Sequence, residues 1–226
     1  MKKNIINGIV ELIWDTPFYS GKYEGDDTFS VDEKGNICGL VLTTAGKEEV
    51  GSDFLKVNIP PINFDSNNFE KLKINDFSES KRQYYFDDKI LFDYRDTKNY
   101  FDLSKFKIKV ITNNIVTFFN VNNKIEFLLV IDIYSFDFYP NSSEDSPLKL
   151  DGFNLFLKKQ IWDFFVRSYL YQYDCSLGEY VDSINSGENL LKNKDIPLSI
   201  IRFINSQVEF WKEIIEDEYP NSYEKL

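Results

Sequence analysis

Two aspartates, Asp132 and Asp137, interrupt the apolar stretch IEFLLVIDIYSFDFY, which covers residues 125–139. A pair of carboxylates can act as general acid and base, as in glycoside hydrolysis, when the two groups lie roughly 5 to 9.5 Å apart. Side chains alternate between the two faces of a strand, so residues five apart in an unbroken strand point to opposite faces. The spacing therefore argues against a catalytic pair, unless a β-bulge near Tyr134 and Ser135 reverses the register.

Asp132 is the residue of this stretch that calls most clearly for an explanation. The neighbouring segments predict a hairpin whose loop is Asn122 and Asn123, because asparagine tolerates positive φ. Strand residues whose numbers sum to 245 would then lie opposite each other, and Asp132 would face Asn113 in the preceding turn. We expect its carboxylate to cap turn amides. A carboxylate-based enzyme with Asp132 at its centre is the alternative.

A second candidate site mixes carboxylates with aromatic side chains over residues 84–102. Aromatic anchors surrounded by carboxylates suit the recognition of a basic protein surface. An ordinary amphipathic strand and turn is the alternative interpretation. The residues predicted to contact such a partner are Asp87, Asp88, Asp93, Tyr94 and Asp96. The carboxylates would steer the partner electrostatically, and Tyr94 would anchor it.

No pattern in the sequence predicts a metal ion or a cofactor. The acidic segment DDTFSVDEKGN, residues 26–36, lacks the ligand spacing of a calcium loop and indicates a solvated hairpin tip. The chain has no histidine, which excludes Ser-His-Asp catalysis and every zinc site that contains histidine. The sequence also lacks phosphate-binding glycine motifs. Cys38 and Cys175 are expected to be buried free thiols of a cytoplasmic protein.

The elements that must position these residues follow from the apolar periodicity. A three-stranded antiparallel meander is predicted over residues 106–139, and helices are predicted at 153–173 and 197–218. The first helix is apolar nearly all round, and the second has an apolar half that includes Phe210. Strands first and helices second predict an α+β fold, with a largely antiparallel sheet packed by the C-terminal helices.

Length and composition are those of a folded chain with a large core. The 226 residues predict a single α+β domain over 1–226, with a β-rich part at 1–140 and a helical part at 150–226. Hydrophobic residues make up 42% of the chain and aromatic residues 17%, which is far too apolar for a disordered protein.

The charge of the chain is strongly acidic and limits the possible partners. Asp and Glu number 37 against 26 Lys and Arg, and segments 15–36 and 209–226 each carry a net charge of −4. Nucleic acids and anionic membranes would repel a net charge of −11, whereas a basic protein would be attracted.

We therefore predict a non-enzymatic, cytoplasmic binding or inhibitor protein for a basic protein partner, such as a bacterial immunity protein that neutralises a toxin. A structural subunit of a larger assembly is a further alternative. The sequence leaves the oligomeric state open.

Overall fold

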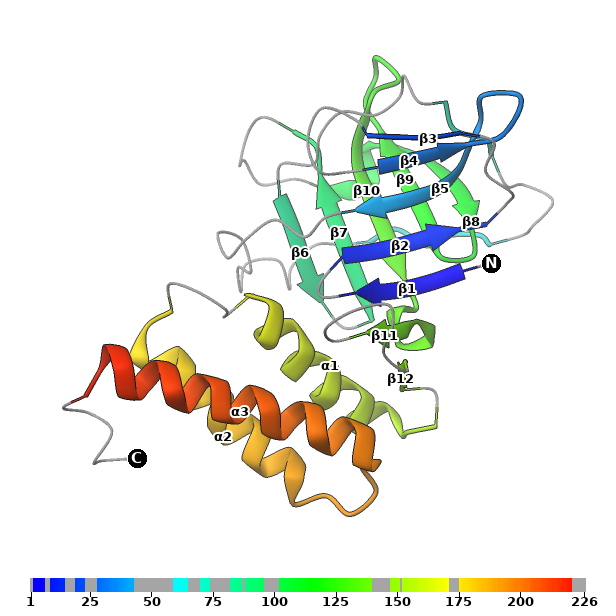
Figure 1. Ribbon diagram of the computed structural model, residues 1–226. Helices are drawn as coiled ribbons and strands as arrows, with labels where there is room; N and C mark the ends of the chain where they lie inside the picture. The colour runs from blue at the N-terminus through cyan, green and yellow to red at the C-terminus, as the bar shows by residue number, and fades with distance from the viewer. Residues whose placement is uncertain are drawn as a thin grey trace. The chain divides into compact units, whose positions relative to one another are not determined.

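The computed structural model describes most of the chain, which forms two compact units, Met1–Phe138 and Tyr139–Leu226. The described residues are 2–6, 9–14, 19–22, 28–42, 59–64, 70–73, 82–86, 88–95, 102–139, 147–150, 152–170 and 175–220. Nearly all strands belong to the first unit and all three described α-helices to the second, so the predicted α+β class is confirmed (Figure 1). The prediction of a single domain stays a prediction.

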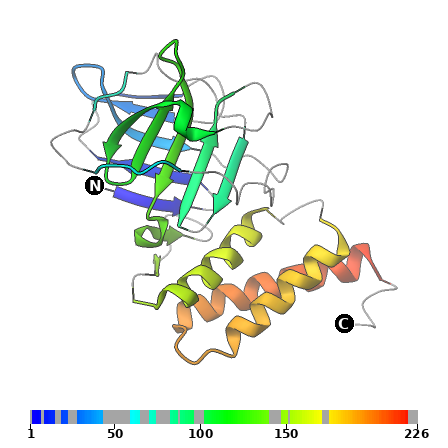
Figure 2. The ribbon, with the colours of Figure 1, turned by 180° about the vertical axis from the view of Figure 1, so that it is seen from behind.

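The first unit consists of two mostly antiparallel sheets, which lie one over the other in the views from opposite sides (Figures 1 and 2). Within this unit the first sheet has the order β11-β1-β2-β5-β4-β3, and the second has the order β6-β7-β10-β9-β8. The strands of the first sheet are β1 Lys2–Ile6, β2 Ile9–Ile13, β3 Tyr19–Lys22, β4 Thr28–Val31, β5 Ile37–Leu42 and β11 Asp137–Tyr139. The strands of the second sheet are β6 Arg82–Phe86, β7 Lys89–Asp93, β8 Lys107–Thr112, β9 Ile115–Phe119 and β10 Ile125–Ile131.

The predicted meander is confirmed as β8, β9 and β10, which are neighbours in the second sheet. Residues 127–130 of β10 pair with β9 in the predicted register. The loop differs from the prediction, because Asn123 has φ 57 and its amide donates to the Asn120 carbonyl at 3.0 Å. This geometry is typical of a three-residue hairpin loop that ends in the left-handed region. An irregularity at Glu126 then shifts the register by one residue and restores the predicted pairs.

The apolar run does not continue as one strand to Tyr139. β10 ends at Ile131, and Asp132, with φ 56, precedes the short 3-10 turn η5 Ile133–Ser135. The next strand, β11, belongs to the other sheet. The predicted end of the meander at residue 139 is therefore wrong, because a residue with positive φ leaves the extended conformation. Asp132 and Asp137 lie in different elements, so strand alternation does not relate them.

Both faces of the second sheet are covered near its centre, since every residue of β9 is buried. One face carries a cluster of fully buried apolar side chains: Leu91, Leu103, Val116, Phe118, Phe127 and Leu129. Partly buried residues Ile59, Ile62 and Phe64 pack against this cluster. The cluster forms the apolar surroundings of the polar network described below.

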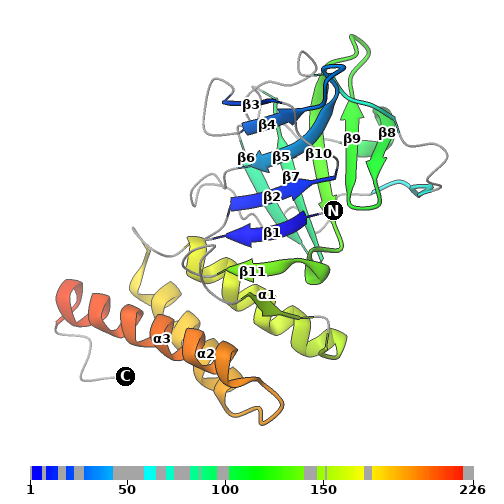
Figure 3. The ribbon, with the colours of Figure 1, turned by 45° about the vertical axis from the view of Figure 1, so that its right-hand side comes forward.

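The second unit contains the helices α1 Leu155–Leu170, α2 Leu177–Leu191 and α3 Leu198–Glu218, after the two-residue strand β12 Leu148–Lys149. The helices predicted at 153–173 and 197–218 are thereby confirmed. The first begins two residues later than predicted, and residues 171–173 lie outside the described residues. In all three views α1 and α3 run in the same direction and α2 runs in the opposite one (Figures 1, 2 and 3). Aromatic rings join α1 to α3: Phe165 stacks on Phe203 with centroids 4.7 Å apart, and the Phe164 centroid lies 5.4 Å from that of Trp211.

The three helices pack closely around Gly187 in α2. A Cβ atom at this position would lie 2.5 Å from Val208 Cγ2 of α3 and 2.7 Å from Phe164 Cε2 of α1. Real Cβ atoms essentially never make contacts this short, so the glycine is required by packing. Gly178, near the start of the same helix, has no atom within 4 Å of such a Cβ.

Candidate functional site

Asp132 lies on the surface at the end of β10. Its side chain is exposed and its carboxylate makes no capping hydrogen bond, so the predicted role in capping turn amides is wrong. Its backbone carbonyl instead accepts hydrogen bonds from the amide of Ser135 at 3.0 Å and from the Ser135 hydroxyl at 2.8 Å. Aspartate enters the left-handed region more readily than most residues. The conformation therefore identifies Asp132 as a turn residue.

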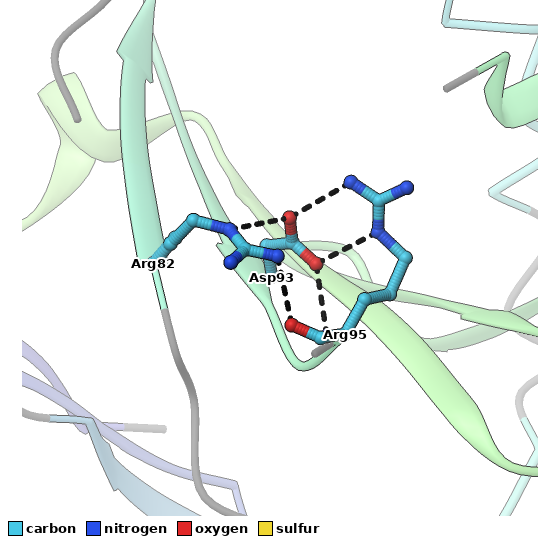
Figure 4. A network of polar contacts seen from close by, with 3 residues as sticks. All are labelled: Arg82, Asp93 and Arg95. Carbon is cyan, nitrogen blue, oxygen red and sulfur yellow. Dashed lines mark hydrogen bonds and ion pairs between the residues drawn. The ribbon is translucent and has the colours of Figure 1, made fainter. Parts of the chain in front are cut away.

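Asp93 lies at the centre of a polar network with Arg82 and Arg95 (Figure 4). The register of β6 and β7 places Arg82 directly opposite Asp93. One carboxylate oxygen of Asp93 accepts from Arg82 Nε at 3.1 Å and from Arg95 Nη2 at 2.9 Å. The other accepts from the Arg95 amide at 3.0 Å and from Arg95 Nε at 2.9 Å. Arg82 Nη2 closes the network by donating to the Arg95 carbonyl at 2.7 Å.

This network is inside the first unit. The exposed fraction of the side chain is 0% for Asp93, 6% for Arg82 and 11% for Arg95. The Arg95 guanidinium carbon lies 4.5 Å from the centre of the Phe127 ring, a cation–π contact that joins the network to the apolar cluster. A buried carboxylate that accepts four hydrogen bonds from two guanidinium groups and an amide holds the hairpin end in place.

The five residues predicted to contact a partner have very different surroundings. Asp93 and Tyr94 are buried in this structure, and Asp88 is partly exposed and forms an ion pair with adjacent Lys89. Asp87 and Asp96 lie outside the described residues. The role of the five in binding a partner stays a prediction, but the buried network gives Asp93 a structural function.

The acidic segment at 26–36 contains the hairpin turn between β4 and β5, in agreement with the predicted hairpin tip. Asp32 Oδ1 accepts hydrogen bonds from the amides of Lys34 at 2.9 Å and Asn36 at 2.8 Å. The side-chain amide of Asn36 donates to both carboxylate oxygens of Asp32. The side-chain bond from Asn36 and then its backbone bond lower the pKa of Asp32 below its ordinary value of 3.8. This carboxylate closes a turn.

Several kinds of chemistry have no matching arrangement in the part of the chain that the structure describes. No group of three or more Asp, Glu or Cys side chains is arranged there to hold a metal ion. Cys38 and Cys175 are buried free thiols, as predicted. No α-helix among the described residues is long and apolar enough to cross a membrane.

The C-terminal half of α3 carries an exposed group of carboxylates: Glu209, Glu213, Glu216, Asp217 and Glu218. Lys212 forms ion pairs with Glu209 at 3.4 Å and with Glu188 of α2 at 3.3 Å. Burial lowers the pKa of Lys212, but the hydrogen bonds and charges of these two carboxylates outweigh burial and raise the pKa above its ordinary value. Among the described residues, no ion pair reaches the other four carboxylates.

Phe210 lies among these carboxylates and is exposed, although the periodicity of α3 placed it with the apolar half. Phe210, Glu213 and Asp217 follow one another at spacings of three and four residues, so they share one face of the helix. We call Phe210 and the four carboxylates that form no ion pair with a described residue, Glu213, Glu216, Asp217 and Glu218, the acidic face; Glu216 and Glu218 flank the row formed by the other three. The sequence indicated its charge but not the exposure of the aromatic ring at its N-terminal edge.

The acidic face is unfavourable for the helix that carries it. The C-terminus of a helix bears a partial negative charge, and exposed carboxylates in the last turn destabilise the helix by about 0.3 to 1 kcal/mol each. Glu216, Asp217 and Glu218 occupy that turn, which contains no basic residue. Glu213 and Asp217 add like-charge repulsion at a spacing of four residues. A local arrangement that lowers stability in this way is expected mainly where a function requires it.

Comparisons with models of protein families, with curated proteins and with solved structures give no match for this chain.

Proposed function

We propose that the chain is a non-catalytic binding protein whose partner is a basic protein, and that the acidic face of α3 contacts this partner. The observation that carries the proposal is the exposed ring of Phe210 beside four exposed carboxylates that form no ion pair with any described residue. An aromatic ring within a charged surface supplies apolar contact area, and the carboxylates around it supply charge complementarity.

The energetics of α3 support a cationic partner. Repulsion among the carboxylates and with the helix dipole destabilises the free helix, and bound Lys or Arg side chains would remove both effects. The net charge of −11 would accelerate the encounter with a positively charged protein. Within this class we propose an immunity protein of the bacterial cytosol, which neutralises a cationic toxin, as the specific hypothesis to test first.

The alternative of an enzyme with Asp132 as its central residue receives no support from the surroundings of that residue. A general acid or base needs an orienting partner or a perturbing environment. Asp132 is instead an exposed turn residue whose carboxylate makes no capping hydrogen bond.

The proposal is tested by capturing proteins from a lysate of the source organism on the immobilised chain, followed by mass spectrometry. The test variant is Glu213→Gln/Glu216→Gln/Asp217→Asn, which removes three carboxylates of the acidic face. The matched control is Glu33→Gln/Asp182→Asn/Asp195→Asn, which makes the same change of charge at three other exposed positions.

We expect the wild type and the control to retain the same basic protein, and the test variant to lose it. Capture by the test variant equal to that by the wild type would exclude the acidic face as the contact surface. Capture of acidic proteins alone would contradict the proposed function itself.

A further inference from the structure

Three large apolar side chains are exposed at one end of the three-helix unit. Leu155 and Phe156, in the first turn of α1, are 72% and 73% exposed, and Leu198, the first residue of α3, is 61% exposed. Because α1 and α3 run in the same direction, their first turns lie at the same end of the unit (Figures 1 and 2). Exposed apolar residues scattered singly need no explanation, but a group of three at one end does.

The two segments that carry these apolar residues are rich in basic residues. Residues 154–159 and 192–202, which form this end, contain the basic residues Lys158, Lys159, Lys192, Lys194 and Arg202. Asp195 is the single acidic residue within the same two segments. We call these two segments the apolar–basic end.

Helix geometry brings charge and apolar surface together at this end. Lys159 follows Leu155 by four residues, and Arg202 follows Leu198 by four, so each basic residue shares a helix face with an exposed leucine. Side chains on a helix lean toward its N-terminus, which directs both basic residues back over the first turn. The first turns of α1 and α3 contain no acidic residue.

We propose that the apolar–basic end binds the surface of an anionic lipid bilayer. Apolar side chains would enter the interface, the basic residues would contact anionic headgroups, and the positive ends of two helix dipoles would face the same surface. Exposure above 60% means that the three apolar side chains protrude from the unit. A fluid interface can enclose protruding side chains, whereas a protein partner would have to supply a fitted pocket for each of them.

Within the helical unit, the acidic face and the apolar–basic end lie far apart along α3. Glu216 follows Leu198 by 18 residues of α3, which corresponds to about 27 Å along a helix that rises 1.5 Å per residue. The Debye length at physiological ionic strength is about 8 Å, so the acidic face is screened from a surface that contacts the apolar–basic end. The expectation that anionic membranes repel this chain was based on the total charge, and it assumed that the charge is spread evenly.

Sedimentation of the full chain with lipid vesicles tests the proposal. The probes are vesicles of phosphatidylcholine alone and vesicles with equal parts of phosphatidylcholine and phosphatidylserine. The apolar variant is Leu155→Ser/Phe156→Ser/Leu198→Ser, and the charge variant is Lys159→Glu/Arg202→Glu. Val121→Ser is the matched control, because Val121 is 96% exposed at the tip of the β9–β10 hairpin, far from these helices in the sequence. Circular dichroism checks that each variant is folded.

We expect the wild type and Val121→Ser to bind the anionic vesicles at least about tenfold more tightly than the neutral ones. Each of the other variants should lose at least about tenfold of the affinity for anionic vesicles. Absence of wild-type binding to the anionic vesicles would overturn the proposal, as would equal binding by the apolar variant. A change of oligomeric state in the apolar variant without a change in vesicle binding would also overturn the proposal. That result would show that the apolar–basic end forms contacts between copies of the chain. The acidic face is intact in all these variants, so the two proposals can fail independently.

Discussion

Replacing Asp93 by asparagine is expected to destabilise the first unit strongly. The side chains have nearly the same shape, but the substitution removes the negative charge that receives four hydrogen bonds from Arg82 and Arg95. The guanidinium groups of Arg82 and Arg95, whose side chains are 6% and 11% exposed, would then stay buried without their carboxylate partner. Removing one partner of a buried ion pair lowers stability by about 3 to 5 kcal/mol, a large share of the roughly 5 to 15 kcal/mol that stabilises a domain.

Native-state hydrogen exchange is the assay for this prediction, because it measures the opening of particular strands in a chain that has two units. We expect the protected amides of β6, β7 and β10 to exchange faster by roughly two to four orders of magnitude, which corresponds to that loss of free energy. The control is Asp88→Asn, which removes a partly exposed ion pair with Lys89 and should change stability by about 0 to 1 kcal/mol. A loss below about 1 kcal/mol for Asp93→Asn would refute the assignment of this network as a structural centre.

Three further predictions concern packing, chemistry and pH. Gly187→Ala should lower the unfolding free energy by about 1 to 3 kcal/mol through overpacking, whereas Gly178→Ala should leave it unchanged or raise it by up to about 1 kcal/mol; a denaturant titration of both variants checks the difference. Asp132→Asn should leave any measured function within a few-fold, and a loss of about 100-fold or more with the fold intact would restore the enzyme hypothesis. The pKa of Asp32 is lowered in the folded chain, so its contribution to stability is present above the unfolded pKa and is lost as the pH falls through the folded pKa. A carboxyl titration by NMR should place this pKa below 3.8, and Asn36→Ala should move it upward.

The fold class and the central strands could be predicted because they follow from local patterns. Alternating and continuous apolar runs identified β8, β9 and β10, and the change of period identified α1 and α3. The register of residues 127–130 was right although the loop was not, since the irregularity at Glu126 compensates for the extra loop residue. The end of β10 at Asp132 could not be read from hydrophobicity, because the apolar run continues into β11 of the other sheet.

The polar network could have been found from the sequence with one further step. β6 ends at Phe86 and β7 begins at Lys89, so two residues separate the strands and Arg82 must lie opposite Asp93. An arginine and an aspartate at opposed positions predict an ion pair. The burial of that pair depends on segments distant in the sequence, such as residues 59–64, which cover the same face of the sheet.

For the acidic face of α3, the sequence predicted the negative charge and nothing more. The segment 209–226 was identified as acidic, but the exposure of Phe210 was not expected, because the periodicity of α3 places this residue with the apolar half. The apolar–basic end could not be predicted from composition. The net charge sums all charged residues, and the helices place the acidic and basic groups far apart. Leu155 and Phe156 belong to a helix that is apolar nearly all round, so the exposure of its first turn could not be predicted from periodicity.

The salt dependence of the association rate is the most direct test of the central claim that the chain binds a basic partner through the acidic face. Stopped-flow mixing with the captured partner would compare the wild type with Glu213→Gln/Glu216→Gln/Asp217→Asn and with the control Glu33→Gln/Asp182→Asn/Asp195→Asn. We predict that the wild-type rate constant falls steeply as salt rises, and that the acidic-face variant associates more slowly than the control and with a weaker salt dependence. A wild-type rate that does not depend on salt, or an acidic-face variant as fast as the control, would contradict the account.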